Sequence, residues 1–291
     1  SKKIFQLLKS PVPATPKDTL RSIMPRCDTN QAILAEPEEE ALHTVFYFPG
    51  CGSERLFSDI GKASLYLLLK NRTRVILPPP FLCCGYPARV NASTEQKGRI
   101  TLRDTIIFSQ IRDMFNDLKF DACIISCGTC RESLEELETG AIFDCKIIDI
   151  SRFIMNINGT VNSSKKYLYH APCHDSLNGE GFDILTKEAG LTVEQIPHCC
   201  SEAGTMAISR PDISNAMLER KKEAIRSVTG TREAMTTMLT NCPSCIQGLG
   251  RNSDLKVNPV HISTELAELT NKEQWKKELK ELMKNCEIIT F

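Results

Sequence analysis

Ten of the 14 cysteines follow a pattern that occurs twice along the chain. In each copy a single cysteine comes first, an adjacent pair follows, and a CxxC closes the pattern. The first copy consists of Cys51, Cys83, Cys84, Cys127 and Cys130, and the second of Cys173, Cys199, Cys200, Cys242 and Cys245. Thiolates are soft ligands that favour zinc, copper(I) or iron–sulfur clusters. The pattern therefore predicts two metal sites with five thiols each.

The fifth thiol in each set favours an iron–sulfur cluster over zinc, because four ligands already saturate a structural zinc. Adjacent cysteines tend to point apart, so they suit different irons of one cluster better than a single ion. Structural zinc, or buried thiols without any metal, remain the alternatives. Glycines at Gly50, Gly85 and Gly128 allow the backbone to approach a cluster and to direct N–H groups at its sulfurs.

The two copies keep nearly the same spacing, which indicates a duplicated domain. The single cysteines lie 122 residues apart, the pairs 116 and the CxxC motifs 115. Two lobes of about 120–140 residues are an ordinary domain size. Prolines and an acidic EPEEE run mark the start of the chain. We predict an extended arm or interdomain linker over 1–43, a first lobe over 44–160, and a second lobe with terminal helices over 161–291.

Strand and helix patterns alternate between the cysteines. Strands are expected at 44–48, 74–77, 122–126, 146–150, 167–170, 193–197, 235–239 and 257–263. Such alternation predicts an α/β protein of two pseudo-symmetric lobes, each a mostly parallel sheet flanked by helices. The motif cysteines fall at strand ends or just beyond, where sites form in such sheets.

Composition narrows the classes of function. Lys+Arg and Asp+Glu each number 36, so no net charge attracts nucleic acid. No apolar run approaches the length of a membrane span, and the start lacks a signal peptide. Free thiols in this number suit a reducing compartment, so we expect a cytoplasmic protein. No P-loop or GxGxxG is present, so nucleotide binding within the chain is not expected.

The C…CCG…CxxC repeats resemble the cysteine-rich CCG domain. Similar domains occur in the cysteine-rich subunit of heterodisulfide reductase and in the iron–sulfur subunits of glycolate oxidase, anaerobic glycerol-3-phosphate dehydrogenase and lactate-utilisation enzymes. The segments FPGCGSERLFSDIG, LPPPFLCCGYP and NCPSCIQGLGR look most like the C-terminal segment of FAD-binding, iron–sulfur 2-hydroxy-acid oxidoreductases. The resemblance covers about residues 44–270. In the second repeat Ser201 stands where the family usually has glycine, which is expected to alter the backbone approach there.

The resemblance implies that each five-cysteine set holds a non-cubane [4Fe–4S] cluster. It also implies an electron-transfer module that takes electrons from a flavin-dependent 2-hydroxy-acid dehydrogenase domain or subunit, which holds the FAD. A quinone, a disulfide or another protein would accept them. A ferredoxin-like relay would belong to a partner, which would also bring the chain to the inner face of the membrane. The alternatives are a catalytic subunit of the heterodisulfide reductase type and a zinc-stabilised, non-enzymatic interaction module.

Several residues near the motifs receive weaker expectations. His170, His174 and His198 surround the second set and either tune it or are satisfied polar side chains. Glu202 either donates a proton during reduction or, as we expect, is a solvated surface residue. Arg55 either binds an anionic substrate or, as we expect, forms an ordinary salt bridge. Cys123 is expected to pack in the core, and Cys27, Cys145 and Cys286 have no partner pattern.

Overall fold

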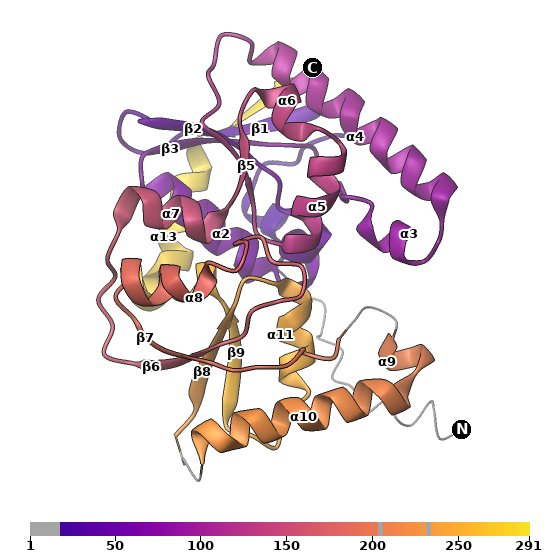
Figure 1. Cartoon of the computed structure of the whole chain (residues 1–291). Coiled ribbons are helices and arrows are strands. Elements are labelled where there is room, and N and C mark those ends of the chain that lie inside the picture. Colours follow the sequence, from indigo (N-terminus) through magenta and orange to yellow (C-terminus); the bar gives the residue numbers. More distant parts are fainter. Residues whose placement is uncertain (1–17, 203–205, 231–233) are drawn as a thin grey trace.

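The computed structural model describes residues 18–202, 206–230 and 234–291, and these residues form two α/β lobes (Figure 1). Each lobe contains one mainly parallel sheet with helices on both faces. The expected fold class is therefore confirmed. The expectation for residues 1–17 lies outside the described residues.

The sheet of the first lobe has six strands in the order β10-β1-β3-β2-β4-β5. Strands β2 to β5 run parallel, whereas β1 is antiparallel to both β3 and β10. The strands are β1 (Gln31–Ala35), β2 (His43–Tyr47), β3 (Thr73–Leu77), β4 (Ala122–Ile125), β5 (Lys146–Asp149) and β10 (Glu287–Thr290).

The sheet of the second lobe has four strands in the order β7-β6-β8-β9, all parallel. They are β6 (Lys166–Tyr169), β7 (Thr192–Gln195), β8 (Thr236–Thr240) and β9 (Val257–His261). In both lobes the strand that leads to the first cysteine lies beside the strand that leads to the CxxC.

Helices cover both faces of each sheet. In the first half of the chain they are η1 (Leu20–Ile23), η2 (Gly52–Leu56), α2 (Ser58–Lys70), α3 (Tyr86–Val90), α4 (Thr94–Met114), α5 (Gly128–Glu136), α6 (Thr139–Phe143) and α7 (Ile150–Asn158). In the second half they are α8 (Gly181–Asp183), η3 (Ile184–Glu188), α9 (Met206–Ser209), α10 (Pro211–Thr229), α11 (Pro243–Gly250), α12 (Ile262–Asn271), η4 (Lys272–Gln274), α13 (Trp275–Leu282) and η5 (Met283–Asn285).

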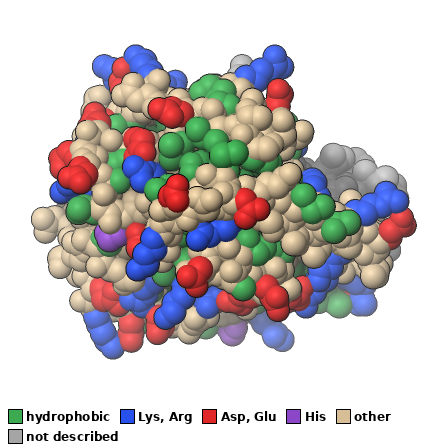
Figure 2. Space-filling model, turned by 90° about the horizontal axis from the view of Figure 1, so that it is seen from above, with side chains coloured by type: hydrophobic (Ala, Val, Ile, Leu, Met, Phe, Trp, Pro, Cys, Tyr) green, Lys and Arg blue, Asp and Glu red, His purple; other side chains and the backbone are tan. Residues whose placement is uncertain are grey.

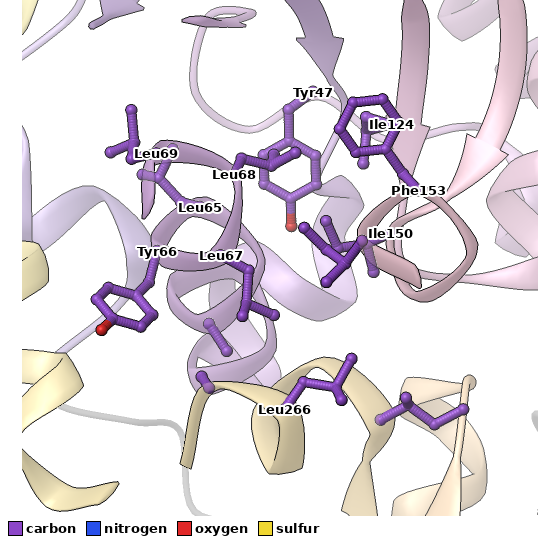
Figure 3. Close-up of a cluster of buried hydrophobic side chains, with 14 of the residues drawn as sticks. Tyr47, Leu65, Tyr66, Leu67, Leu68, Leu69, Ile124, Ile150, Phe153 and Leu266 are labelled. Carbon is purple, nitrogen blue, oxygen red and sulfur yellow. The ribbon is translucent and has the colours of Figure 1, made fainter. Parts of the chain in front are cut away.

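Side-chain alternation along β2 divides the first lobe into two cores. Val45 and Tyr47 face the space between the two sheets, while Phe46 and Phe48 face the layer that contains α4. Helix α2 fills the space between the sheets and is buried from Ile60 to Leu69, because the sheet lies on one side of it and α12 and α13 on the other (Figure 3). Truncating a side chain such as Leu68 to alanine there is expected to cost about 2–5 kcal/mol. Because α12 follows the last strand of the second lobe, its packing on α2 joins the two lobes in one core.

The ends of the chain differ in detail from the sequence-based prediction. Residues 31–35, within the expected arm, form β1, and the unpredicted β10 pairs with it at the sheet edge. Helix α13, expected with the second lobe, packs on α2, where Tyr66 donates to Glu278 at 2.7 Å and Lys276 contacts Asp59 at 2.6 Å. Each of these segments is held in part by residues far away in sequence. The boundaries at 43/44 and 160/161 stay a prediction.

On the face shown in Figure 2, basic and acidic side chains are interspersed, and no large patch carries charge of one sign. This pattern fits the balance of 36 basic and 36 acidic residues. Among the described helices, none is both long and apolar enough to span a bilayer.

Candidate metal centre

The ten motif cysteines lie at the carboxyl ends of the parallel strands. In each lobe the single cysteine follows the first strand (β2 or β6), and the adjacent pair lies in the loop after the next strand (β3 or β7). Cys127 and Cys242 follow β4 and β8 and are the N-cap residues of α5 and α11. Each CxxC therefore occupies the first turn of a helix, where backbone N–H groups lack helical partners.

The sulfurs of the first set contact one another in sequence. Sγ of Cys51 and Sγ of Cys83 are 4.0 Å apart. Cys83 contacts Cys84, which contacts Cys130, and Cys130 contacts Cys127. The five thiols that the sequence predicts as one site therefore come together.

The second set repeats this arrangement. Sγ of Cys173 and Sγ of Cys199 are 3.8 Å apart, Cys199 contacts Cys200, and Cys200 contacts Cys245. Cys245 in turn contacts Cys242.

One contact joins the two sets across the lobes. The thiol of Cys127 contacts that of Cys242, the corresponding cysteine of the other repeat. All ten sulfurs thus form a continuous row with Cys51 at one end and Cys173 at the other.

Burial follows the same symmetry. Cys51 and Cys173 are exposed, and Cys83 and Cys199 are partly buried. The six inner cysteines, Cys84, Cys127, Cys130, Cys200, Cys242 and Cys245, are buried. Each set is therefore closed towards the other lobe and open at its outer end.

Backbone N–H groups point at the sulfurs of each adjacent pair. Gly85 donates to Cys83 from a left-handed conformation with φ of 80°. In the other lobe Ser201 donates to Cys199 at 3.4 Å and has φ of 65°. Ser201 thus keeps the left-handed torsion of Gly85 despite its Cβ. The expected change in how the backbone approaches a cluster stays a prediction.

Glycines also set how closely the backbone approaches the sulfurs. A Cβ on Gly50 would lie 2.9 Å from Sγ of Cys130. A Cβ on Gly128 would lie 1.8 Å from the carbonyl oxygen of His174, so α5 of the first lobe meets the backbone of the second. The pseudo-symmetric contact joins Gly52 and Pro243, with a Cβ on Gly52 3.3 Å from the proline Cβ.

The contacts between sulfurs favour ionisation at particular thiols. Hydrogen bonds with Cys51 and Cys84 hold the pKa of Cys83 far below its usual range. Contacts with Cys199 and Cys245 do the same for the pKa of Cys200, and contacts with Cys130 and Cys242 lower that of Cys127. Thiolates, the form that binds metals, are therefore available in both sets.

The three histidines differ in their surroundings. His170 is buried, and burial lowers its pKa, so the ring is neutral. His174 links the lobes through Tyr86, whose hydroxyl lies 2.7 Å from Nε2, and through Glu132, 2.8 Å from Nδ1. His198 has an exposed side chain and φ of 71°.

Two expectations about charged residues are wrong. Glu202 is partly buried beside Cys200, and this burial raises its pKa to about 7. The guanidinium of Arg55 lies over the ring of Phe81, 3.8 Å from the centroid, and has no ion pair among the described residues. The expectation for Cys123 holds, because this thiol is fully buried in the core.

Sequence reasoning missed one buried charged residue near the second set. Lys221 on α10 is fully buried, and its Nζ lies 3.0 Å from Nδ1 of His170. Its burial depends on contacts with the carbonyls of Ile196 and Pro197, which no local sequence pattern indicates.

A separate cavity of about 560 Å³ lies where α2 faces α11, β9 and α13. Its walls contain Lys62, Lys276, Asp59 and His261 but no motif cysteine. It is therefore distinct from the row of sulfurs.

The donor set fits a thiolate-held group in both lobes. Buried sulfurs in mutual contact favour soft metals, and the fifth thiol of each set exceeds the needs of a single zinc. At the second set the buried ring of His170 forms a hydrogen bond with the thiol of Cys200, and a ring nitrogen of His170 and the sulfurs of Cys200 and Cys245 lie within 4.8 Å of one another. Lys221 has no carboxylate partner among the described residues, so thiolates are its available counter-charges.

Comparison with known proteins identifies several relatives. The chain is 24% identical over 210 residues to a fumarate reductase (CoM/CoB) subunit of Methanothermobacter marburgensis, covering 68% of this chain and 40% of that protein. It is 26% identical over 245 residues to the lactate utilization protein A of Halalkalibacterium halodurans, covering 79% of this chain and 97% of that protein. An uncharacterised iron–sulfur protein of Methanococcus maripaludis is 23% identical over 218 residues, covering 72% of this chain and 41% of that protein. The chain thus spans less than half of the Methanothermobacter and Methanococcus proteins and nearly all of the lactate utilization protein A.

Among solved structures, glutamate racemase RacE1 of Bacillus anthracis aligns with a TM-score of 0.35 and 14% identity, covering 84% of this chain and 82% of that one. A similarity of this size does not establish a common fold.

The profile of the cysteine-rich CCG domain matches residues 45–135 and 167–250. These two matches contain both thiol sets and cover more than half of the chain. The chain therefore belongs to the family of proteins with the cysteine-rich CCG domain.

Proposed function

We propose that the protein is an iron–sulfur electron-transfer component of a larger oxidoreductase. The observation that carries the proposal is the continuous row of ten sulfurs, made of two symmetric sets that meet at Cys127 and Cys242. Each set is buried towards the other and open at its outer end. Such an arrangement suits electron passage between two adjacent sites, with one end of each accessible to a partner.

The proposed ligands are the five cysteines of each set, which would each hold one [4Fe–4S] cluster of the non-cubane type. When bound, such a cluster accepts and releases electrons. The residues of this chain supply thiolates, direct the N–H groups of Gly85 and Ser201 at the sulfurs, and exclude water from the inner six cysteines. Hydrogen bonds to the sulfurs and burial set the potential.

The proposed electron donor is a flavoprotein dehydrogenase domain or subunit that acts on a 2-hydroxy acid and holds FAD. Relatives named for lactate utilization support this choice. A ferredoxin-like relay would lie in the partner, and a quinone, a disulfide or a protein would accept the electrons. We place the complex in the cytoplasm, with any attachment to the inner face of the membrane supplied by the partner.

A second candidate is a disulfide reductase. The exposed outer sulfurs, Cys51 and Cys173, would allow a substrate to reach each set. A relative named for fumarate reduction with CoM and CoB supports it. Reduction of a heterodisulfide by the isolated, chemically reduced chain would favour this candidate, whereas reduction of the chain by a flavoprotein alone would favour electron transfer.

The proposal is tested by the iron, sulfide and zinc content of protein purified without oxygen. About eight irons and eight sulfides per chain are expected, the sum of two four-iron clusters. Zinc without sulfide would overturn the proposal and favour a zinc-stabilised interaction module.

Variants that replace both cysteines of an adjacent pair show which thiols hold the iron. Replacing both Cys83 and Cys84 with serine is expected to remove about half of the iron and of the visible absorbance. The matched variant at Cys199 and Cys200 is expected to remove the other half. Replacing the buried Cys123, which lies outside both sets, with alanine is the control and should leave the iron content unchanged. Full iron content in either paired variant would exclude those ligands.

A further inference from the structure

Lys221 is a buried lysine beside the second thiol set. Its side chain is fully buried on α10. Nζ lies 3.0 Å from Nδ1 of His170 and donates to the carbonyl oxygens of Ile196 at 3.0 Å, Pro197 at 2.9 Å and His198 at 3.1 Å. These carbonyls can only accept, so the contacts favour an ammonium group.

A buried cation is costly unless a negative charge lies nearby. No carboxylate pairs with Lys221 in the part of the chain that the structure describes. Burial lowers the pKa of Lys221 to about 8, and the charges of Cys200, Cys245 and Cys199 act in the opposite direction. Of these three thiols, Cys200 is the one whose pKa is held below its usual range. The second thiol set is therefore the natural counter-charge of Lys221.

The ammonium also fixes the state of His170. An ammonium has three hydrogens for these four acceptors, so one hydrogen is shared between Nδ1 and a carbonyl oxygen. Because Nζ can only donate, Nδ1 accepts, and the hydrogen of the neutral ring lies on Nε2. Nε2 is buried, and a hydrogen bond links the ring to the thiol of Cys200. The ring lies within 4.8 Å of the sulfurs of Cys200 and Cys245. The N–H is therefore available to these sulfurs.

The first lobe lacks both features. The offset of 122 residues between the single cysteines places Phe48 where the second lobe has His170. Aligning the first residues of α4 and α10, Thr94 and Pro211, gives an offset of 117 and pairs Asp104 with Lys221. Asp104 is fully buried and pairs with Arg103 at 2.8 Å. The first lobe thus has the apolar ring of Phe48 and an acid, Asp104, that is paired with arginine. The second lobe has the N–H donor His170 and the cation Lys221, which has no carboxylate partner among the described residues.

We propose that Lys221, partly through His170, makes the site of the second lobe the more easily reduced of the two. Positive charge and N–H donors near the sulfurs stabilise the reduced, more negative state of a cluster. Lys221 is a positioning residue, since it orients His170 and does not itself touch the sulfurs. This inference rests on the proposed function, and it adds a direction: an added electron resides first in the second lobe.

The test is a dithionite titration of the anaerobic full-length chain, followed by electron paramagnetic resonance. The wild-type protein is expected to show two reduction steps, and the Cys83/Cys84 double serine variant should lose the one at lower potential. Lys221→Met should make the second-lobe step at least tenfold less favourable, a shift of about 59 mV for a one-electron couple. Lys221→Arg, which keeps the charge, should move it much less.

Matched variants separate this effect from a structural one. Asp104→Asn, at the corresponding position of the first lobe, should move only the first-lobe step. His170→Phe copies Phe48 and should lower the second-lobe potential even if Lys221→Met protein loses iron.

Equal reduction potentials of the two sites in the wild type would overturn the inference. So would Lys221→Met and His170→Phe proteins that hold the full iron content and show unshifted reduction steps. A wild-type chain without iron and sulfide would instead overturn the proposed function, so the two failures can be distinguished.

Discussion

Ser201 occupies a backbone position that favours glycine. Its φ of 65° matches the 80° of Gly85 at the corresponding place in the first lobe. Its hydroxyl is buried and has no hydrogen-bond partner in the described structure. A side chain in the left-handed region costs about 1–3 kcal/mol, and a buried hydroxyl without a partner adds to this cost. The second lobe therefore carries local strain that the first lobe avoids.

Ser201→Gly is therefore expected to stabilise the protein by about 1 kcal/mol, after the greater chain entropy of glycine is subtracted. Gly85→Ser is the matched control and should destabilise it by about the same amount. Its new Cβ would lie 3.4 Å from Ile100, an ordinary contact, so the backbone torsion dominates. The denaturant midpoint of unfolding measures both changes.

Measuring the midpoints with and without iron completes this test. A Ser201→Gly protein that is less stable only when loaded with iron would mean that the hydroxyl has a partner in the loaded state. A loss of stability in both states would contradict the strain argument.

Individual ligand candidates were predictable from the sequence, whereas their neighbours were not. The repeated spacing identifies ten cysteines that the fold brings into one row. Lys221 and Asp104 belong to no recognisable motif, and a lysine in an amphipathic helix is normally solvated. Only the packing of α10 against the β7 loop reveals that Lys221 is buried.

At the scale of elements, the first turn of α5 fixes how the lobes meet. Gly128 lies so close to His174 that a Cβ would be 1.8 Å from its carbonyl oxygen and 2.4 Å from its carbonyl carbon. Both are backbone atoms, which cannot rotate away. Arg131, one turn further along α5, reinforces this junction by donating to the carbonyl of Ser176 at 2.8 Å and to Asn178 at 2.8 Å.

Gly128→Ala is expected to push α5 away from the second lobe and to destabilise the protein by at least about 1–3 kcal/mol. The same shift would separate Cys127 from Cys242, so iron content should fall as well. Gly98→Ala in α4 is the control: its Cβ would meet nothing within 4 Å, and alanine is the better helix former. Unchanged stability and iron content in Gly128→Ala would contradict this account of the junction.

Most elements between the cysteines were predictable, because their apolar patterns have helical or strand periodicity. Strand β1 was missed because prolines and acidic residues surround it, and β10 because it is a short strand after the last helices. Strand β1 gains its stability from pairing with β3 and β10, and β10 from pairing with β1; the pairing of β1 with β10 joins distant parts of the chain. Local sequence carries no signal for such pairing.

At the scale of the whole molecule, the last parallel strand of each lobe ends in a residue that crosses to the other lobe. His261, after β9, caps α12 through Nδ1 and contacts the carbonyl of Ser126 through Nε2 at 3.2 Å. Asp149, after β5, caps α7 and accepts a hydrogen bond from Ser176. The last residues of β5 and β9 therefore each form a hydrogen bond with the other lobe, and the shifted pKa values of these two residues predict that lobe packing depends on pH.

His261 is expected to weaken the protein in mild acid. Burial lowers its pKa to about 4, whereas an unfolded histidine has a pKa of about 6.5. Between these pH values the unfolded chain binds a proton that the folded chain does not, so stability falls as the pH falls. The slope from this one residue is about 1.4 kcal/mol per pH unit. Burial raises the pKa of Asp149 to about 6, which gives the opposite slope from about pH 6 down to about pH 4.

Because these slopes oppose each other, the test compares variants rather than reading one curve. His261→Asn keeps an acceptor for the helix cap but does not titrate. Its unfolding free energy, measured anaerobically in denaturant at pH 7, 6 and 5, should fall less with acid than that of the wild type. The stability of the wild type relative to the variant should drop by about 1 kcal/mol between pH 6 and pH 5, where the unfolded histidine is mostly protonated. Parallel curves would show that His261 is protonated equally in both states, and would exclude it as the acid-sensitive link between the lobes.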